Sequence, residues 1–254
     1  WGYHPYFPTQ APAFEFRYTP SDHDDDAKTV LGNNIPAGGG MNDVEMVLDI
    51  LCAHPSTANF ISKKLCKFFY SEVPPQSLVD AVSATYTATD GDIKEMVRTL
   101  FLTVDPGNAP PKFKRPFHHF ISALRVTAAS IGSTVAIRNN MSNAGQLPFM
   151  WPRPDGYPDQ FIKWSDLLLP RWKFGASIVE GQISSVTVDT KNFFDGTLTA
   201  DEAADRIDAK LFSGAMSTYD KNRIRDYLLP APENLTLLQD ALGLALGSPG
   251  FQWY

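Results

Sequence analysis

From residue 42 onwards, apolar residues recur at the three-and-four spacing of amphipathic helices, and this pattern constrains the fold most. Val44, Val47, Leu48 and Leu51 form the first stripe, one face of an α-helix. Further stripes predict helices near residues 60–69, 78–86, 93–101, 117–128, 164–178, 199–207, 224–228 and 235–246. We therefore expect a mainly α fold, a multi-helix globular domain.

The first forty residues follow another pattern, rich in Pro, Gly, Tyr and Phe. Residues 13–18 alternate apolar and polar side chains as a short strand does, and residues 29–31 can form a second strand. These two segments predict a small N-terminal β-hairpin. We expect a β/loop segment over 1–40 and a helical domain over 41–254, packed as one globular unit. Because the chain opens with Trp1, we expect a processed product or the C-terminal part of a longer protein.

Capping residues predict where three of the helices begin. Asn42 followed by Glu45 has the spacing of a capping box, and so does Thr199 followed by Glu202. Asp92 is expected to cap the helix that follows it.

The charge balance excludes one class of partner and the hydropathy another. The 22 Lys and Arg residues against 28 Asp and Glu give a net charge of -6, which argues against a broad basic face for nucleic acid. No apolar run approaches the roughly 18 residues that span a bilayer, so we expect no membrane span.

Cysteines and sequons bear on the cellular compartment. Cys52 and Cys66 fall in helices too far apart in register for a disulfide, so we expect two thiols in the core. The sequons at Asn140 and Asn234 favour an exported glycoprotein.

Several short motifs, in order along nearly the whole chain, carry a family resemblance. They are Ser21–Asp24, Lys28–Gly32, Leu51–Pro55, Phe60–Leu65, Thr89–Asp92, Lys112–Pro116, Ser122–Arg125, Pro154–Pro158 and Ser248–Gln252. The chain resembles the C-terminal half of the bacterial family called domain of unknown function 1800. The resemblance implies an exported, mostly helical protein, secreted or periplasmic, and implies no reaction. Asp25, Asp26 and residues 130–142 depart from the family pattern.

The densest group of ionisable residues lies at Asp22–Asp26. Its carboxylates and His23 are ligands that suit a hard cation, but the residue spacing of a calcium-binding loop is missing. We therefore predict that Asp25 and Asp26 form a solvated acidic turn. The resemblance falls on His23, Asp24 and Lys28. His23 beside Asp24 is a candidate general base, with Lys28 as a ligand contact. The alternative is a structural hydrogen bond from His23 that ties the hairpin to the helices.

A second candidate site lies at the start of the helix that follows Pro116. Lys114, Arg115 and His118 stand at this entrance, and Arg125 lies seven residues after His118 on the same face. Cations that converge on a helix N-terminus would bind an anion such as a carboxylate or sulfate of a polysaccharide. The alternative is a network of structural ion pairs.

The third candidate is the segment 145–159, whose four prolines exclude a helix. Asp155, Tyr157 and Asp159 are candidate catalytic or binding groups, and Arg171 is expected to point towards these carboxylates. The alternative is an ordered strap held by aromatic side chains, which we favour for Trp151.

Two functions remain open from the sequence. The first is a hydrolase or lyase that acts on an extracellular carbohydrate polymer, with His23, Asp24 and Asp155 as catalytic groups. The second is a noncatalytic module that binds carbohydrate or protein at the cell surface. No cofactor or zinc motif is found, so we expect neither a cofactor nor a metal. The expected partners are an extracellular polysaccharide and the missing N-terminal part of the same protein.

Overall fold

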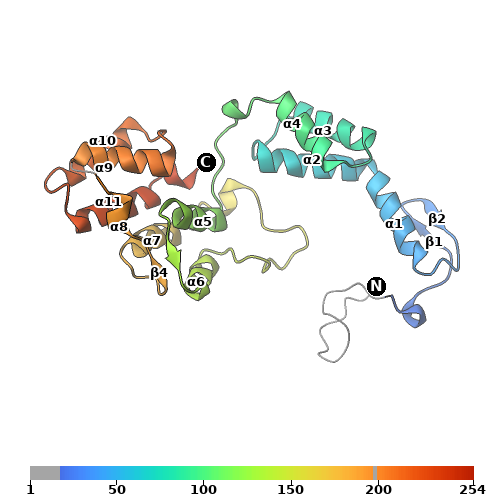
Figure 1. The fold of residues 1–254 in the computed structure, drawn as a ribbon. Helices are drawn as coiled ribbons and strands as arrows, with labels where there is room; N and C mark the ends of the chain where they lie inside the picture. Colours follow the sequence, from blue (N-terminus) through green and yellow to red (C-terminus); the bar gives the residue numbers. More distant parts are fainter. Residues whose placement is uncertain (1–17, 197–198) are drawn as a thin grey trace. The chain divides into compact units, whose positions relative to one another are not determined.

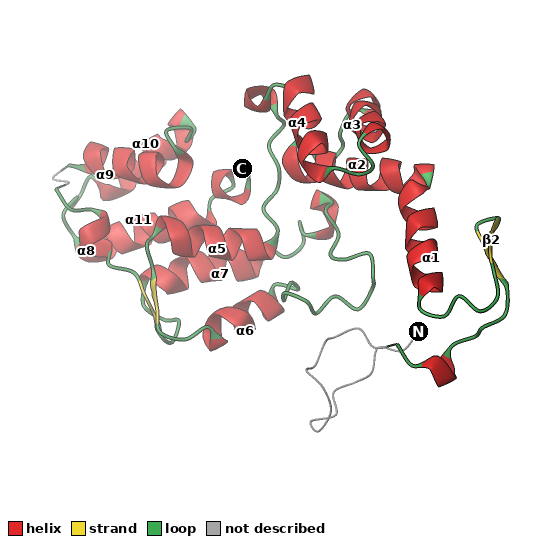
Figure 2. Cartoon of the chain, turned by 45° about the vertical axis from the view of Figure 1, so that its right-hand side comes forward, coloured by secondary structure: helices red, strands yellow, loops and turns green. Residues whose placement is uncertain are grey.

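The computed structural model describes residues 18–196 and 199–254, and the chain divides into two compact units. Unit 1 is Trp1–Ala109 and unit 2 is Pro110–Tyr254. Helices dominate both units and strands are short (Figures 1 and 2), so the prediction of a mainly α fold is confirmed. The division after residue 109 differs from the boundary expected at residue 40, because the hairpin and the first four helices belong to the same unit.

The N-terminal β-hairpin is present, with a different partner strand from the one expected. β1 (Lys28–Val30) pairs antiparallel with β2 (Asn33–Ile35), and Lys28 lies opposite Ile35. Leu31 and Gly32 both have positive φ, as a two-residue hairpin turn requires. Residues 13–17 of the other predicted strand lie outside the described residues.

Unit 1 continues with four helices. They are α1 (Asn42–Ala53), α2 (Pro55–Phe69), α3 (Gln76–Ala88) and α4 (Ile93–Thr103). α3 packs against both α2 and α4 (Figure 1). The core between them consists of Cys66, Leu78, Val79, Val82, Met96 and Leu100.

The buried face of α2 differs from the predicted one. Phe60 and Phe68 are exposed, whereas Ala58, Ser62 and Cys66 are buried. The three small residues follow the same four-residue spacing on another side of the helix, and they allow close approach of α3. Of the predicted stripe, Ile61 and Leu65 are half-buried and pack against this core, whereas Phe60, Phe68 and Phe69 are exposed.

Two of the three predicted caps form. Asp92 accepts hydrogen bonds from the backbone N–H groups of Lys94 and Glu95, and Thr199 forms a capping box with Glu202. The box predicted at Asn42 and Glu45 is wrong, because Met41 occupies the N-cap position and no side chain caps α1.

Unit 2 is built around α5, α7 and α11. Its elements are α5 (Pro116–Val126), β3 (Ser130–Ile131), α6 (Val135–Asn143), α7 (Leu168–Val179), β4 (Val186–Thr187), α8 (Thr190–Phe193), α9 (Ala200–Ile207), α10 (Thr218–Leu228) and α11 (Leu235–Gly247). α7 and α11 lie side by side (Figure 2). Phe120 of α5 stacks on Phe174 of α7 with ring centroids 4.2 Å apart.

Glycine permits the close packing of α7 against α11. A Cβ atom on Gly175 would lie 3.0 Å from Cβ of Leu246 and 3.3 Å from the carbonyl oxygen of Gly243. A Cβ atom on Gly243 would lie 3.2 Å from Cα of Ala176. The two helices therefore touch through backbone at this point, and larger residues would separate them.

Three parts of unit 2 can be compared with the elements predicted from its sequence. Residues 145–160 are irregular as predicted, and α7 begins at Leu168 instead of 164, with Pro170 tolerated in its first turn. The helix α6 and the β3–β4 pair were not predicted. Asn140 lies within α6, and the Asn234 side chain caps α11.

Two further expectations concern thiols and membranes. Both cysteines are free thiols as predicted, but only Cys66 lies in the core, and the core position expected for Cys52 is wrong because its side chain is exposed. Among the described helices, none combines the length and apolar character needed to cross a bilayer.

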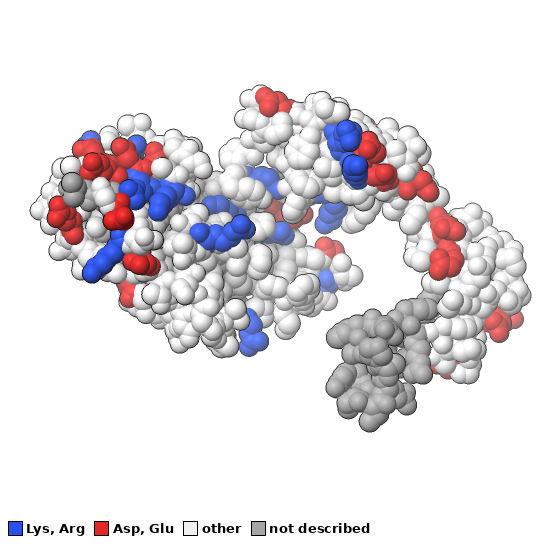
Figure 3. All heavy atoms as spheres, viewed as in Figure 1, with Lys and Arg blue, Asp and Glu red and all other residues white. Residues whose placement is uncertain are grey.

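The surface charges of unit 2 are mixed over α9 and α10, where acidic and basic side chains alternate (Figure 3). Lys221 of α10 pairs with Asp205 at 2.6 Å and with Asp208 at 3.3 Å. This surface is a locally neutralised network, not a patch of one sign.

Candidate functional site

In unit 1, His23 and Lys28 meet at one buried carboxylate. His23 Nε2 lies 3.1 Å from Oδ2 of Asp43, and Lys28 Nζ donates to the same oxygen at 2.9 Å. Asp43 belongs to α1 and is 2% exposed. The contact ties the residues around the hairpin to α1, which was the structural alternative for His23.

The hydrogen bond from Lys28 lowers the pKa of Asp43 below its ordinary value, and the one from His23 acts in the same direction. The same hydrogen bond raises the pKa of Lys28. Asp43 is therefore a carboxylate and Lys28 an ammonium at neutral pH. The Asp43 carboxylate accepts a hydrogen bond from Nε2–H of His23. In the neutral imidazole, Nε2 therefore carries the proton and Nδ1 carries the lone pair.

The other carboxylate oxygen of Asp43 lies against the Gly38–Gly40 loop. A Cβ atom on Gly39 would clash with Oδ1 of Asp43, so a larger residue at this position would displace the Asp43 side chain. Oδ1 has no hydrogen-bond partner within the part of the chain that the structure describes. The glycine-rich segment is thus a close-packed wall of the Asp43 site.

The acidic residues after His23 are exposed. Oδ1 of Asp24 accepts the backbone N–H of Asp26 at 3.0 Å, which forms a local turn. Asp25 lies 3.8 Å from His23 Nε2. Among the described residues, no group of three or more His, Cys, Asp or Glu side chains is arranged to hold a metal ion.

In unit 2, the residues at the entrance of α5 have separate surroundings. Lys114 is buried with Nζ 3.7 Å from the centroid of the Phe251 ring. Arg115 pairs with Asp159 at 3.3 Å, and His118 lies edge-on to Tyr254 with centroids 5.9 Å apart. Arg125 is exposed in the last turn of α5, roughly 10 Å along the helix from His118 at 1.5 Å per residue. The expected convergence of Arg125 on the helix N-terminus is therefore wrong.

One backbone amide in the first turn of α5 is already hydrogen-bonded within unit 2. The backbone N–H of Phe117 donates to the side-chain oxygen of Gln146 at 2.9 Å. A glutamine side chain from the loop after α6 thus satisfies the group that we expected to face an anion.

The segment 145–159 is held as an ordered strap. The hydroxyl group of Tyr157 donates to the carbonyl oxygen of Leu147 and accepts its N–H, at 2.8 Å and 3.1 Å. Trp151 Nε1 donates to Asp155 at 3.1 Å, and its ring lies 4.9 Å from that of Tyr157. These contacts agree with the strap alternative, and the Arg115–Asp159 pair joins the strap to the entrance of α5.

Arg171 is fully buried and does not point towards the loop carboxylates. Its Nη1 donates to the carbonyl oxygen of Lys114 at 2.6 Å and to Oε1 of Gln252 at 3.1 Å. Its guanidinium lies 4.4 Å from the centroid of the Phe113 ring. Arg171 therefore clamps the segment before α5 to the segment after α11.

These two segments are paired and carry a group of aromatic rings. Lys112 and Tyr254 exchange both backbone hydrogen bonds, at 2.8 Å and 3.0 Å. Phe113, Phe161 and Trp253 pack together with centroids 4.9 Å to 5.3 Å apart. Two rings of this group are partly exposed, Phe161 by 36% and Trp253 by 37%. The neighbouring ring of Tyr254 is 56% exposed. We call this surface the C-terminal aromatic face; it comprises Phe113, Phe161, Trp253 and Tyr254 with the basic residues Lys112, Arg115 and His118.

Basic side chains surround His118 at this face, and one of them, Arg115, is paired with Asp159. Burial lowers the pKa of His118, and the positive charges of Arg115, Lys112 and Lys114 lower it further. The Lys112 ammonium lies 5.6 Å from the centroid of the Tyr254 ring. Cations next to exposed rings suit a ligand with apolar faces and negative groups.

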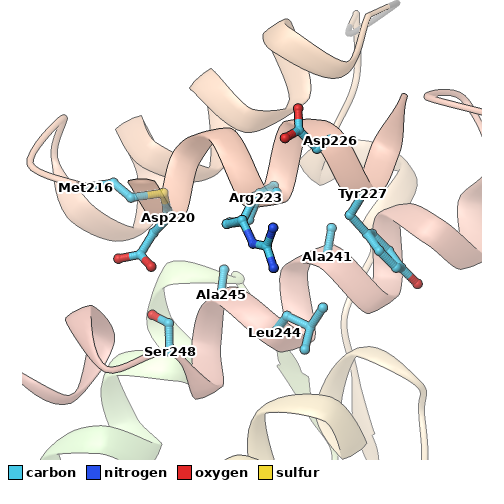
Figure 4. A pocket seen from close by; sticks show the side chains of 10 residues that line it. Met216, Asp220, Arg223, Asp226, Tyr227, Ala241, Leu244, Ala245 and Ser248 are labelled. Carbon is cyan, nitrogen blue, oxygen red and sulfur yellow. The ribbon is translucent and has the colours of Figure 1, made fainter. Parts of the chain in front are cut away.

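A separate cavity of about 440 Å³ lies between α10 and α11 (Figure 4). Ala241, Leu244 and Ala245 line its α11 side, and Arg223 extends between the helices. Its polar rim is paired locally, because Asp220 bonds to Ser217 and Tyr227 to Asp240. None of the predicted site residues lines this cavity.

Sequence reasoning missed Asp43, His119 and the C-terminal rings. His119 shares the spacing of the buried residues Pro116 and Ala123, so helical periodicity contained the signal. Asp43 was hidden because the cap was assigned to Asn42. The rings of Phe113, Phe161 and Trp253 meet only through chain pairing of residues far apart in sequence.

Comparisons with known proteins assign the chain to a family. Neither the curated proteins nor the solved structures include a match to it. The family model described as "Protein of unknown function (DUF1800)" matches residues 1–253. The motifs and the mainly α fold agree with that match, and the chain belongs to the DUF1800 family.

Proposed function

We propose that this chain is a noncatalytic binding module of an exported protein, secreted or periplasmic, and that its C-terminal aromatic face binds an extracellular polysaccharide with carboxylate groups. The observation that carries the proposal is the set of exposed rings flanked by cations in unit 2. Sugar rings stack on aromatic side chains, and cations attract the carboxylates of uronate residues.

The pairing of Tyr157 and of the two strap carboxylates supports binding over catalysis. An active site brings polar groups together in one pocket with unspent hydrogen-bonding capacity. In unit 2, Tyr157, Asp155 and Asp159 each have a local partner. The strap that carries them is joined to the C-terminal aromatic face through the Arg115–Asp159 ion pair.

Affinity electrophoresis in gels that contain alginate tests this function. Alginate, a polyuronate, should retard the protein, and neutral dextran at equal mass should not. Tyr254→Ala and Lys112→Gln should weaken retardation about tenfold or more, as expected for loss of an interface contact of ~1.4 kcal/mol. Trp172→Ala is the matched control, because Trp172 is an exposed tryptophan of unit 2 outside the ring group. Equal retardation of all variants would refute the proposal.

A hydrolase or lyase is the second candidate, and the His23–Asp43 pair favours it. A carboxylate that orients an imidazole is the arrangement of a general base, and Lys28 beside it can hold a negative charge. The test incubates the chain with alginate and measures cleavage through the release of reducing ends. For an enzyme, His23→Ala should abolish cleavage with unchanged helical content, and His54→Ala should leave it intact. Absence of cleavage by the unmodified chain eliminates this candidate.

A further inference from the structure

Beneath the C-terminal aromatic face, unit 2 buries a group of polar side chains. These side chains have more N–H donors than there are acceptors near them. Lys114, His119, Arg171 and Gln252 are between 0% and 7% exposed. Arg171 and Gln252 are bonded to each other, and the rings of Phe113 and Phe251 cover Arg171 and Lys114. His119 lies edge-on to Phe251 with centroids 5.4 Å apart. The four side chains therefore share one enclosed region.

Five nitrogen atoms in this region lie outside hydrogen-bonding geometry with any described residue. They are Nε and Nη2 of Arg171, Nε2 of Gln252, and Nδ1 and Nε2 of His119, whose ring also interacts with the backbone of Arg171. Nε and Nη2 form one edge of the guanidinium, with two parallel N–H bonds at the spacing of carboxylate oxygens. The opposite side, at Nη1, is already used by Lys114 and Gln252. The free edge is thus the one that recognises planar anions.

The charges of the region point to an anion and not only to a neutral acceptor. Burial alone lowers the pKa of Lys114 to about 8 and that of Arg171 to about 10, and among the described residues no acidic side chain opposes it. Two positive charges are therefore enclosed without a described counterion. A neutral acceptor would satisfy the N–H groups, but only a negative group would offset the electrostatic cost of this charge.

We propose that the Nε–Nη2 edge of Arg171, together with the Gln252 amide and the His119 ring, binds one carboxylate group inside unit 2. The carboxylate oxygens accept the two N–H bonds of Arg171, and Gln252 and His119 donate from the side. The ligand class is a small carboxylate anion or a carboxylate carried by a sugar acid. This site is separate from the proposed polysaccharide face and does not depend on it.

The test measures the thermal unfolding midpoint of the full chain in sodium formate, acetate or galacturonate, against sodium chloride at equal ionic strength. The proposal predicts a saturable rise with a carboxylate beyond that with chloride. A rise with formate and acetate alone identifies a free small anion, and a rise with galacturonate alone identifies a sugar acid. Equal midpoints in all four salts would overturn the proposal.

Variants locate the site within unit 2. Gln252→Met keeps Arg171 and removes one donor, and Arg171→Lys keeps the charge and removes the two-nitrogen edge. Either should weaken the apparent affinity for the active carboxylate about tenfold, as for loss of one hydrogen bond to a charged group. Gln146→Met is the matched control, because Gln146 is a buried glutamine of the loop after α6 that bonds to the first turn of α5, and it should leave the affinity unchanged. An unchanged affinity in Gln252→Met and Arg171→Lys would refute this assignment.

A spectroscopic measurement on the unmodified chain is independent of any loss of folding. Burial, followed by the charges of Arg171 and Lys114, lowers the pKa of His119 to about 3. A bound carboxylate would raise it, since a nearby negative charge favours the imidazolium. NMR titration of the ring with and without formate should show this rise, and superimposable titrations would contradict binding of formate at His119.

Discussion

The buried imidazole of His119 should make the stability of unit 2 depend steeply on pH. Its pKa is about 3 in the folded protein, and in an unfolded chain a histidine titrates near 6.5. The folded state therefore binds fewer protons than the unfolded state between these values, so stability is highest above pH 6.5 and falls as the pH decreases towards 3. At about 1.4 kcal/mol for each pKa unit, lowering the pH from about 7 to about 5 should cost ~2 kcal/mol.

Urea unfolding followed by tryptophan fluorescence measures this effect, because Trp151, Trp164, Trp172 and Trp253 all lie in unit 2. Cationic buffers without oxyanions keep the proposed carboxylate site out of the measurement. His118, whose pKa is also lowered, acts in the same direction, and the neighbouring Lys114 and Arg171 stay charged below pH 7. The comparison is therefore with His119→Gln.

His119→Gln should remove about 2 kcal/mol of the difference between the two pH values. His54→Asn is the control: Nδ1 of His54 caps α2 in unit 1, and asparagine keeps an acceptor there. It should leave the pH dependence of the fluorescence transition unchanged. An equal pH dependence in His119→Gln and the unmodified chain would refute the buried, neutral state of this ring.

Three further substitutions test the packing. Gly175→Ala should destabilise unit 2 by ~1–3 kcal/mol in urea unfolding, because its Cβ would press on Leu246 and the Gly243 carbonyl; a neutral result would contradict the close contact of α7 and α11. Gly39→Ala should displace Asp43 and reduce hydrogen-exchange protection of residues 28–35. Unchanged protection would show that the loop accommodates the added methyl group and that the Asp43 contacts stay intact. Asp92→Ala should cost ~1 kcal/mol through loss of the cap on α4, whereas Asp92→Asn should recover most of it.

The sequence predicted helices well where apolar spacing and caps agreed. The Leu78, Val82 and Tyr86 stripe corresponds to α3, and Asp92 marks the start of α4. It failed where small residues make the contact: α2 buries Ala58, Ser62 and Cys66, which no hydrophobicity argument ranks above phenylalanine. α6 escaped because its polar composition hides the two buried residues Ile137 and Met141.

The candidate sites were less predictable, because their partners are distant in sequence. His23 and Lys28 were identified, but their common partner Asp43 lies in another element. Arg171 was expected to meet a carboxylate and instead binds a backbone carbonyl and a glutamine 81 positions away. Such contacts follow from chain pairing around residues 112 and 254, which local patterns do not encode.

We propose that the C-terminal aromatic face binds an acidic polysaccharide. Calorimetric titration of the full chain with alginate oligosaccharides, in parallel with Trp253→Ala and Trp172→Ala, tests it most directly. We predict saturable binding that Trp253→Ala weakens about tenfold or more and that Trp172→Ala leaves unchanged. No binding to the unmodified chain, or equal binding by both variants, would contradict the claim.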